Sequence, residues 1–262
     1  MSRMFDSGSG PPLIVIPGVQ GRWEWMQPAL MALQTRCRTI AYTLCGDFGS
    51  ERKLDPALGF ENYMQQLDVV FEERGLARAA LCGVSYGGFI ALHYAATRPE
   101  RVSALILTSA PAPGWSPSPR QQRYVARPWL STPAFIAAAP FRVWPEIARA
   151  LPDWRRRLWF MVRHGLRVIG APMMPSRMAE RVRLEQSLDF RPDCERLAAP
   201  ALIVTGEEGL DSVVPVHVTK MYESLLPGAR LEQMSNTGHI GMLTQPERFA
   251  QIVGGFVHAH HH

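Results

Sequence analysis

The chain has 262 residues, of which 47% are hydrophobic and 19% charged, and its formal net charge is +5. This length and composition fit one large globular domain, or a domain with an insertion, and they exclude a disordered chain. No apolar stretch approaches the roughly 20 residues of a membrane span, and no recognised nucleic-acid-binding motif accompanies the positive charge. We therefore expect no transmembrane segment and no nucleic-acid partner.

The positive charge is concentrated in one segment. Residues 117–196 contain 15 Arg and no Lys against 7 acidic residues, a balance of +8. The remaining residues therefore sum to −3. Two explanations stay open: a solvated helical surface, or a surface that binds anionic substrate groups or an acidic membrane.

The cysteines predict the cellular compartment. All four are scattered and none forms a CxxC pair, which is typical of reduced, buried residues in a cytoplasmic protein: Cys37, Cys45, Cys82 and Cys194. The first residues have no basic segment followed by a long apolar core, so we predict no secretory signal. Residues 258–262 resemble a purification tag, and we expect a tail there and no metal site.

Hydrophobic periodicity predicts alternating strands and helices. Short apolar runs predict strands at 13–16, 38–44, 78–84, 102–108, 201–205 and 230–234. Longer amphipathic or apolar runs predict helices at 23–33, 60–73, 89–98, 216–226 and 246–257. This order implies an α/β fold, with a mostly parallel, doubly wound sheet and helices on both faces.

The alternation breaks between Ala110 and Pro200, where a proline-rich loop leads into helical stretches that we expect to be divided by prolines. We predict a helical lid at 111–199, inserted into a core formed by residues 1–110 and 200–257. Most of the large aromatic and Met residues of the lid are expected to pack within it or against the core. Some should line an apolar pocket, with one or more Arg near its entrance.

Residues Gly83-Val84-Ser85-Tyr86-Gly87 lie between a predicted strand and a predicted helix. This is the context of a nucleophile elbow, a turn too sharp for side chains at the two glycine positions. The turn exposes the serine hydroxyl above the sheet. The alternative is a glycine-rich turn whose serine only caps the helix, but the flanking strand and helix favour a nucleophile.

A serine nucleophile needs a base and an acid that orients it. His239 follows the last predicted strand and is the candidate base. The acid is sought after the strand at 201–205, where Glu207, Glu208 and Asp211 all lie. Backbone N–H groups of Tyr86 and Val19 are the candidate donors to an oxyanion.

Several stretches together resemble the α/β-hydrolase superfamily, and within it the lid-bearing esterase, lipase and C–C hydrolase group. They are Ile16-Pro17-Gly18-Val19, Gly83-Val84-Ser85-Tyr86-Gly87-Gly88, Pro200-Ala201-Leu202-Ile203-Val204-Thr205-Gly206-Glu207 and Gly238-His239. The resemblance implies a Ser85–His239–Asp211 triad, because Asp211 stands four residues before Pro215, as this superfamily's acid usually does.

The chain departs from the superfamily pattern at four places. Pro17-Gly18 replaces the usual His-Gly, the loop at 43–48 lacks the usual sequence, and the acid loop is two residues longer. About a dozen residues precede the first predicted strand, so the usual N-terminal hairpin is not expected. The second departure leaves the packing of the 43–48 loop open.

The predicted activity is hydrolysis of a carboxylic ester, or a related acyl bond, of a small or medium apolar substrate through an acyl-enzyme. No metal and no organic cofactor is implied, and the partner is a small molecule. Other reactions on the same triad stay open, namely C–C bond, lactone or thioester hydrolysis and cofactor-free perhydrolysis. A non-enzymatic receptor of this fold is a further alternative.

Overall fold

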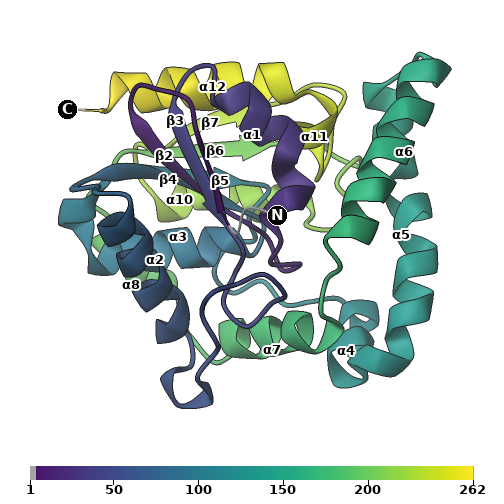
Figure 1. The fold of residues 1–262 in the computed structure, drawn as a ribbon, viewed down its shortest axis with the longest axis horizontal. Coiled ribbons are helices and arrows are strands. Elements are labelled where there is room, and N and C mark those ends of the chain that lie inside the picture. Colours follow the sequence, from purple (N-terminus) through teal and green to yellow (C-terminus); the bar gives the residue numbers. More distant parts are fainter. Residues whose placement is uncertain (1–3, 262) are drawn as a thin grey trace.

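Short runs of buried apolar residues form a seven-stranded sheet in the computed structural model, which describes residues 4–261 (Figure 1). The strand order is β1-β3-β2-β4-β5-β6-β7, and every pair is parallel except the antiparallel pair of β1 with β3. The strands are β1 Met4–Ser7, β2 Pro12–Ile16, β3 Arg38–Tyr42, β4 Ala79–Val84, β5 Val102–Thr108, β6 Ala201–Thr205 and β7 Arg230–Gln233.

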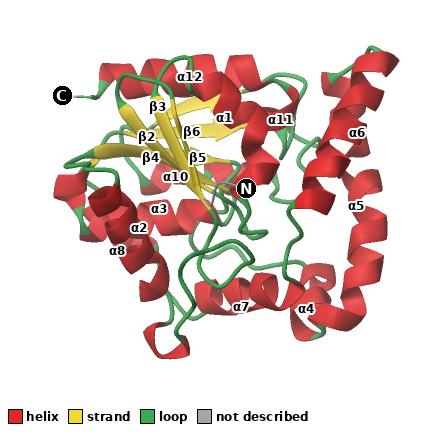
Figure 2. Ribbon diagram, viewed as in Figure 1, coloured by secondary structure: helices red, strands yellow, loops and turns green. Residues whose placement is uncertain are grey.

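Helices cover both faces of the sheet, as Figure 2 shows. One core lies under α2 (Glu61–Glu73) and α3 (Gly87–Thr97), and a second core lies under α1 (Gln27–Leu33) and α12 (Pro246–Ala259). Outside the β5–β6 connection the helices are η1 Trp23–Met26, α1 Gln27–Leu33, η2 Pro56–Leu58, α2 Glu61–Glu73, α3 Gly87–Thr97, η3 Pro99–Arg101, α9 Val216–Lys220, α10 Tyr222–Leu225, α11 Gly241–Thr244 and α12 Pro246–Ala259. The predicted doubly wound α/β architecture is confirmed.

The strands buried on both faces match the sequence predictions best. The strands predicted at 102–108 and 201–205 have the observed bounds of β5 and β6. The helix predicted at 23–33 is a 3₁₀ turn followed by α1, and the one predicted at 216–226 is divided into α9 and α10.

Strand β1 was not predicted, and the expectation that the sheet begins with the strand at 13–16 is wrong. This edge strand has four residues, none of them fully buried, so it carries little hydrophobic signal. The Asp6 carboxylate accepts hydrogen bonds from Arg38 of β3 at 3.1 and 2.9 Å, which helps to hold the edge in register. It also lies 3.7 Å from Arg74.

The connection between β5 and β6 consists of helices, which we call the inserted segment (residues 111–199). Its helices are α4 Pro119–Ala126, α5 Pro128–Ala150, α6 Trp154–Gly170, α7 Pro175–Gln186 and α8 Arg191–Arg196. In Figure 1, α5 and α6 stand at one side of the molecule, away from the strands. Within residues 4–261 no helix combines the length and apolar character needed to cross a membrane.

The prolines of α5 do not divide it, so the expected breaks at Pro133, Pro140 and Pro145 are wrong. All three lie on the exposed side of the helix. A carbonyl that loses its helical partner there remains accessible to water, which lowers the cost of an internal proline.

Strand β2 is the point at which the order of strand addition reverses from one side of the sheet to the other. The chain passes from β2 to β3 on one side and then returns to β4 on the other. Ile16 and Gly83 are paired in register, so the loops after β2 and β4 begin side by side. Crevices at such reversal points, beyond the carboxyl ends of parallel strands, are where open α/β sheets bind ligands.

Candidate active site

Ser85 lies on the turn between β4 and α3, in a backbone conformation that side chains rarely adopt, with φ of 52°. The Ser85 N–H donates to the carbonyl of Thr108 at 2.9 Å, and the N–H of Gly88 donates to the carbonyl of Ser85 at 2.8 Å. These bonds hold the turn to β5 and to the first residues of α3. Such strain persists only where the surroundings enforce it, and it is concentrated at functional sites.

The two glycines of the motif allow close backbone contact. A Cβ on Gly83 would lie 2.4 Å from the carbonyl oxygen of Gly87, and a Cβ on Gly87 would lie 2.5 Å from that of Ile16. Neither position has room for a methyl group. The chain therefore turns sharply at Ser85 while α3 packs directly against the end of β2.

The loop after β2 brings Val19 to the same place. A Cβ on Gly18 would lie 3.3 Å from the Cβ of Ser85, so the loop passes beside the serine. The side chains of Val19, Ser85 and Tyr86 line one cavity. The structure thus brings together the predicted nucleophile and the two residues predicted to donate to an oxyanion.

A buried arginine of the inserted segment holds this loop. Arg181 of α7 donates to the carbonyl of Val19 at 2.8 Å and forms an ion pair with Asp47. The side chains of Arg181 and Asp47 are both almost fully buried. Removing either partner would leave the other charge buried and uncompensated, which is strongly destabilising.

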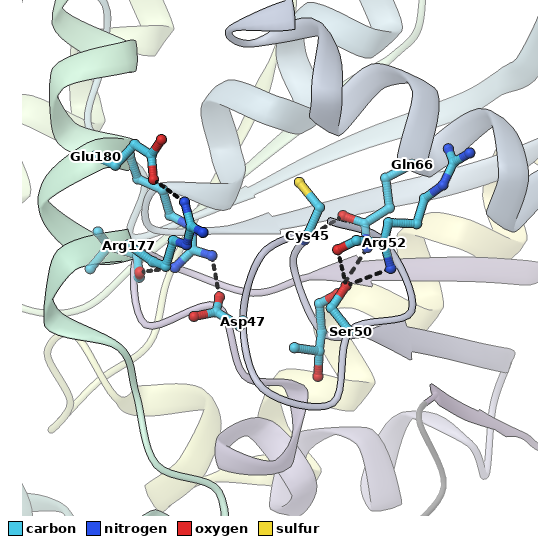
Figure 3. Close-up of polar contacts among 10 residues, drawn as sticks. Cys45, Asp47, Ser50, Arg52, Gln66, Arg177 and Glu180 are labelled. Carbon is cyan, nitrogen blue, oxygen red and sulfur yellow. Dashed lines mark hydrogen bonds and ion pairs between the residues drawn. The ribbon is translucent and has the colours of Figure 1, made fainter. Parts of the chain in front are cut away.

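The same contacts define the packing of the 43–48 loop, which the sequence left open. Figure 3 shows Asp47 directed towards α7, where Arg177 and Glu180 form an ion pair at 2.6 Å. At the other end of the loop, Gln66 of α2 accepts from the N–H of Cys45 at 2.9 Å and donates to the carbonyl of Thr43 at 2.9 Å. The loop is therefore held between α2 and α7.

His239 and Asp211 are in direct contact. Nδ1 of His239 lies 3.0 Å from Oδ2 of Asp211. The other oxygen, Oδ1, accepts from the N–H groups of Val213 and Val214 at 2.9 and 2.8 Å. Both carboxylate oxygens are thus satisfied, and the first is directed at the imidazole. The side chains of Val213 and Val214 line the same cavity as Ser85.

The loops that carry Asp211 and His239 are in backbone contact. A Cβ on Gly206 would lie 2.5 Å from the carbonyl oxygen of Thr237, and a Cβ on Gly238 would lie 2.4 Å from that of Leu210. The N–H of Glu207 also donates to the carbonyl of Thr237 at 2.8 Å. Glycines at both positions let the acid loop and the histidine loop meet, and this contact sets the distance between Asp211 and His239.

Glu146 is a functional candidate that the sequence analysis missed. It lies on α5 and is 1% exposed, and its carboxylate accepts from the N–H of Ile240 at 2.9 and 3.2 Å. Burial raises the pKa of Glu146 to about 7, although its hydrogen bonds and the nearby His239 act in the opposite direction. The sequence did offer one indication that Glu146 has a special role, because it is the only acidic residue of Pro128–Ala150.

The electrostatic surroundings of His239 favour its protonated form. Burial alone would lower the pKa of this imidazole, but Asp211 and Glu146 together outweigh burial and raise the pKa above its ordinary value. A hydrogen bond from Nδ1–H to Asp211 leaves Nε2 as the nitrogen that can accept a proton. The arrangement can therefore take up a proton during a reaction and stabilise the imidazolium that forms.

The cavity beside Ser85 has a volume of about 220 Å³ and is walled mainly by apolar side chains of the inserted segment. Two charged residues also reach it, Arg142 of α5 and Glu185 of α7. Apolar residues of α4, α5 and α7 that line it include Tyr124, Val125, Phe135, Val143, Met178 and Val182. Cavities with such walls and a few polar groups are typical of sites for small molecules.

The expectation that most large apolar side chains of the inserted segment pack inward is wrong for five of them. Among the large aromatic and Met residues of the inserted segment, those that line the cavity are Trp115, Tyr124, Phe135, Met173 and Met178. Five are between 46% and 81% exposed: Trp129, Phe141, Trp144, Trp154 and Trp159. Helical spacing predicted an apolar face but gave no information about what that face contacts.

The fold and the cavity define the class of this protein. The sequence pattern of the family described as alpha/beta hydrolase fold matches residues 11–246. The chain therefore belongs to the α/β hydrolase family, and it is an enzyme of the hydrolase class.

Two curated proteins match over nearly the whole chain. A pimeloyl-[acyl-carrier protein] methyl ester esterase of Nitrosomonas europaea is 26% identical over 93% of this chain and 94% of its own length. RutD of Serratia proteamaculans, which is named for carbamate hydrolysis, is 23% identical over 96% of this chain and 92% of its own length. At these identities the names describe those proteins, and this chain is similar to them.

Solved structures show the same fold. A thermophilic esterase from Thermogutta terrifontis has a TM-score of 0.79 and 22% identity, covering 99% of this chain and 93% of the esterase. An enol-lactonase from Burkholderia xenovorans has a TM-score of 0.77 and 18% identity, covering 97% of this chain and 95% of the lactonase. Proteins named for different reactions thus share this architecture.

Proposed function

We propose that the protein hydrolyses carboxylic esters with a small or medium apolar acyl group, through a Ser85–His239–Asp211 triad. The observation that carries the proposal is the position of Ser85. It lies on a strained turn at the floor of an apolar cavity, and the residues that hold Asp211 against His239 line that cavity too. An ester without charge on its acyl group fits such walls.

The mechanism that we infer gives each of these residues a role. His239 accepts the proton of the Ser85 hydroxyl at Nε2 as the Ser85 oxygen forms a bond to the substrate carbonyl carbon. Asp211 holds Nδ1–H and stabilises the imidazolium. The N–H groups of Val19 and Tyr86 bind the oxyanion, each contributing about 3 kcal/mol to transition-state stability.

The carbon–oxygen bond to the alcohol then breaks, and His239 returns its proton to the leaving alcohol. Water attacks the acyl-enzyme while His239 accepts a proton from it, and the acid leaves with Ser85 restored. In this scheme the inserted segment acts as a lid, because its helices supply most of the cavity wall. The four free, buried cysteines support a cytoplasmic enzyme.

The proposal is tested with a fluorophosphonate probe and p-nitrophenyl butyrate. We expect the probe to label Ser85, and Ser85→Ala and His239→Ala each to lower kcat/KM by about 10³-fold or more. Ser131→Ala is the matched control, because Ser131 lines the same cavity but lies on a helix. The control should keep both labelling and turnover. Activity of Ser85→Ala within tenfold of the parent would disprove the assignment.

A further inference from the structure

An unpaired apolar stripe runs along the outer side of α6. Its exposed members recur at helical spacing and are between 48% and 78% exposed: Trp154, Leu158, Trp159, Val162, Leu166 and Ile169. Single exposed apolar residues are ordinary, but six on one helix face form a patch of the kind that marks an interaction site.

The opposite face of α6 already has its partner. Trp25 packs edge-on against His164, and its indole N–H donates to the carbonyl of Ala171 at 2.9 Å. Arg167 donates to Gln27 at 2.8 Å, and Phe160 stacks on His164. Because this inner face is fixed to η1 and α1, the apolar stripe faces away from the protein core.

Arginines border the stripe. Arg155, Arg156 and Arg163 are exposed on α6, and α5 and α6 together span residues 128–170 with 7 Arg, no Lys and 2 acids. The two acids leave this excess of positive charge largely intact. Glu146 is buried against the histidine loop, and Asp153 caps α6 by accepting from the N–H groups of Arg155 and Arg156 at 2.7 and 3.2 Å.

Arginine guanidinium groups lie over the rings of the exposed tryptophans. The guanidinium of Arg155 lies 5.5 Å from the ring centre of Trp154, and that of Arg163 lies 5.0 Å from the ring centre of Trp159. Arg157 stands 5.3 Å from the ring centre of Trp144, which extends the arrangement onto α5. We call this outer surface of α6, with Trp144 of α5, the Trp–Arg surface.

We propose that the Trp–Arg surface docks on an anionic lipid membrane, with α6 lying in the plane of the interface. Tryptophan rings prefer the headgroup level, and an amphipathic helix inserts its apolar face just below it. Guanidinium groups pair with lipid phosphates in a bidentate manner. At the membrane interface each guanidinium loses part of its hydration, and its contact with an aromatic ring offsets part of that free-energy cost.

Charge argues against a second copy of the chain as the occupant. A two-fold dimer through this surface would place the same patch on both sides of the interface. Each copy would bring 7 Arg against 2 acids in residues 128–170, and one of these acids, Glu146, is buried, so the interface would hold a large excess of positive charge. Membrane docking needs no helix that crosses the bilayer, and within residues 4–261 there is none.

The experiment is co-sedimentation of the full chain with vesicles of phosphatidylcholine alone or mixed with phosphatidylglycerol. We expect binding only to the anionic vesicles, and weaker binding as the salt concentration rises. The double variant Trp159→Ser/Leu166→Ser should bind at least about tenfold more weakly. Arg155→Gln and Arg163→Gln should each lower affinity about fivefold.

Matched controls come from outside the surface. Phe48 is 62% exposed and Trp159 is 61% exposed, so Phe48→Ser removes a similarly exposed ring and should leave binding unchanged. Arg191→Gln is the corresponding charge control. Circular dichroism and thermal unfolding establish that every variant is folded.

Three results would overturn the proposal. The first is failure of the parent to bind anionic vesicles, and the second is an equal loss of binding in the Phe48→Ser control. The third is a concentration-dependent dimer in light scattering that Trp159→Ser/Leu166→Ser abolishes, which would assign the surface to a second copy. Neither readout depends on catalysis by Ser85.

Discussion

The carboxylate of Glu146 accepts a hydrogen bond from the backbone N–H of Ile240, the residue that follows His239 in the chain. This contact joins the middle of the inserted segment to the histidine loop, across 94 residues of sequence. When it is ionised, Glu146 also acts with Asp211 to raise the pKa of His239. One side chain thus holds the loop in place and affects the ionisation of its imidazole.

The Glu146→Ala variant should therefore lose both stability and rate. Leaving the N–H of Ile240 without its partner costs about 1–3 kcal/mol in the free energy of unfolding, measured by urea denaturation. A displaced imidazole should lower kcat about tenfold or more, with a smaller change in KM. Glu180→Ala is the control, because its ion pair with Arg177 lies at the surface and contributes at most about 1 kcal/mol.

The Glu146→Gln variant separates charge from structure. Glutamine keeps an acceptor for Ile240 but removes a carboxyl that becomes ionised around its pKa of about 7, so the pKa of His239 should fall. Because His239 must be neutral to act as a base, the acidic limb of the pH profile of kcat/KM should move to lower pH. An unchanged limb, together with parental stability, would show that Glu146 has no effect on the imidazole.

The identity of the acid is tested by three single substitutions. Asp211→Asn keeps the shape of the side chain but no longer stabilises the imidazolium, so kcat should fall about 10³–10⁴-fold. Glu207→Gln and Glu208→Gln should keep turnover within about twofold, because only Asp211 contacts His239 among these three acids. Loss of turnover in Glu208→Gln, with near-parental turnover in Asp211→Asn, would show that Glu208 is the acid that orients His239.

The turn at Ser85 can be tested through its glycines. Gly87→Ala would place a methyl group 2.5 Å from the carbonyl oxygen of Ile16, and we expect a cost of about 2–3 kcal/mol in stability and a large loss of turnover. The matched control is Gly165→Ala in α6, where a Cβ meets nothing within 4 Å. The control should gain about 0.5–1 kcal/mol in stability. Equal effects in the two variants would argue against steric restriction at the turn.

Much of the core was predictable because its signals are local. Strand β5 is seven consecutive residues buried on both faces, and the apolar run alone predicts its bounds. The elbow was predictable for the same reason, since strand, turn and helix follow one another within 20 residues. Strand β1 escaped prediction because four partly exposed residues at an edge have no such pattern.

The missed parts depend on contacts between residues distant in sequence. The Arg181–Asp47 pair spans 134 residues, and nothing in either local sequence indicates that a charge is buried there. Likewise Phe135 and Phe141 lie on one helix, but the first lines the cavity and the second is 81% exposed. Their identity gave no information about which neighbour, if any, covers them.

The cavity predicts a dependence on acyl length. Each added methylene that is buried should improve transition-state binding by about 0.8 kcal/mol, or about fourfold in kcat/KM, until the cavity is full. A series of p-nitrophenyl esters from acetate upward should therefore rise and then level off or fall. A steady fall from acetate onward would indicate a tight or polar acyl site.

Substitution of two alanines of α5 tests whether the acyl group occupies this cavity. Ala139 lines the cavity, so Ala139→Leu should shift the optimum towards shorter acyl chains. Ala137 is exposed on the same helix, and Ala137→Leu should leave the optimum in place. A shift in both variants, or in neither, would place the acyl group elsewhere.

Glu185 predicts a pH dependence of stability. Its carboxyl lines the apolar cavity, and burial raises its pKa from an ordinary value of 4.5 to about 7. Below the ordinary value it is protonated in both the folded and the unfolded chain. Between 4.5 and about 7 the folded chain retains a proton that the unfolded chain releases, so a rise in pH favours unfolding.

The Glu185→Gln variant should therefore gain stability relative to the parent as pH rises. Because each pKa unit corresponds to about 1.4 kcal/mol, the relative gain is at most about 3 kcal/mol and is complete a little above pH 7. The measurement is urea unfolding of both proteins at several pH values from about 4.5 to 8, compared as the difference between their free energies of unfolding. Taking the difference removes the contribution of every other titrating group. A constant difference across this range would show that the Glu185 carboxyl titrates alike in the folded and unfolded chains.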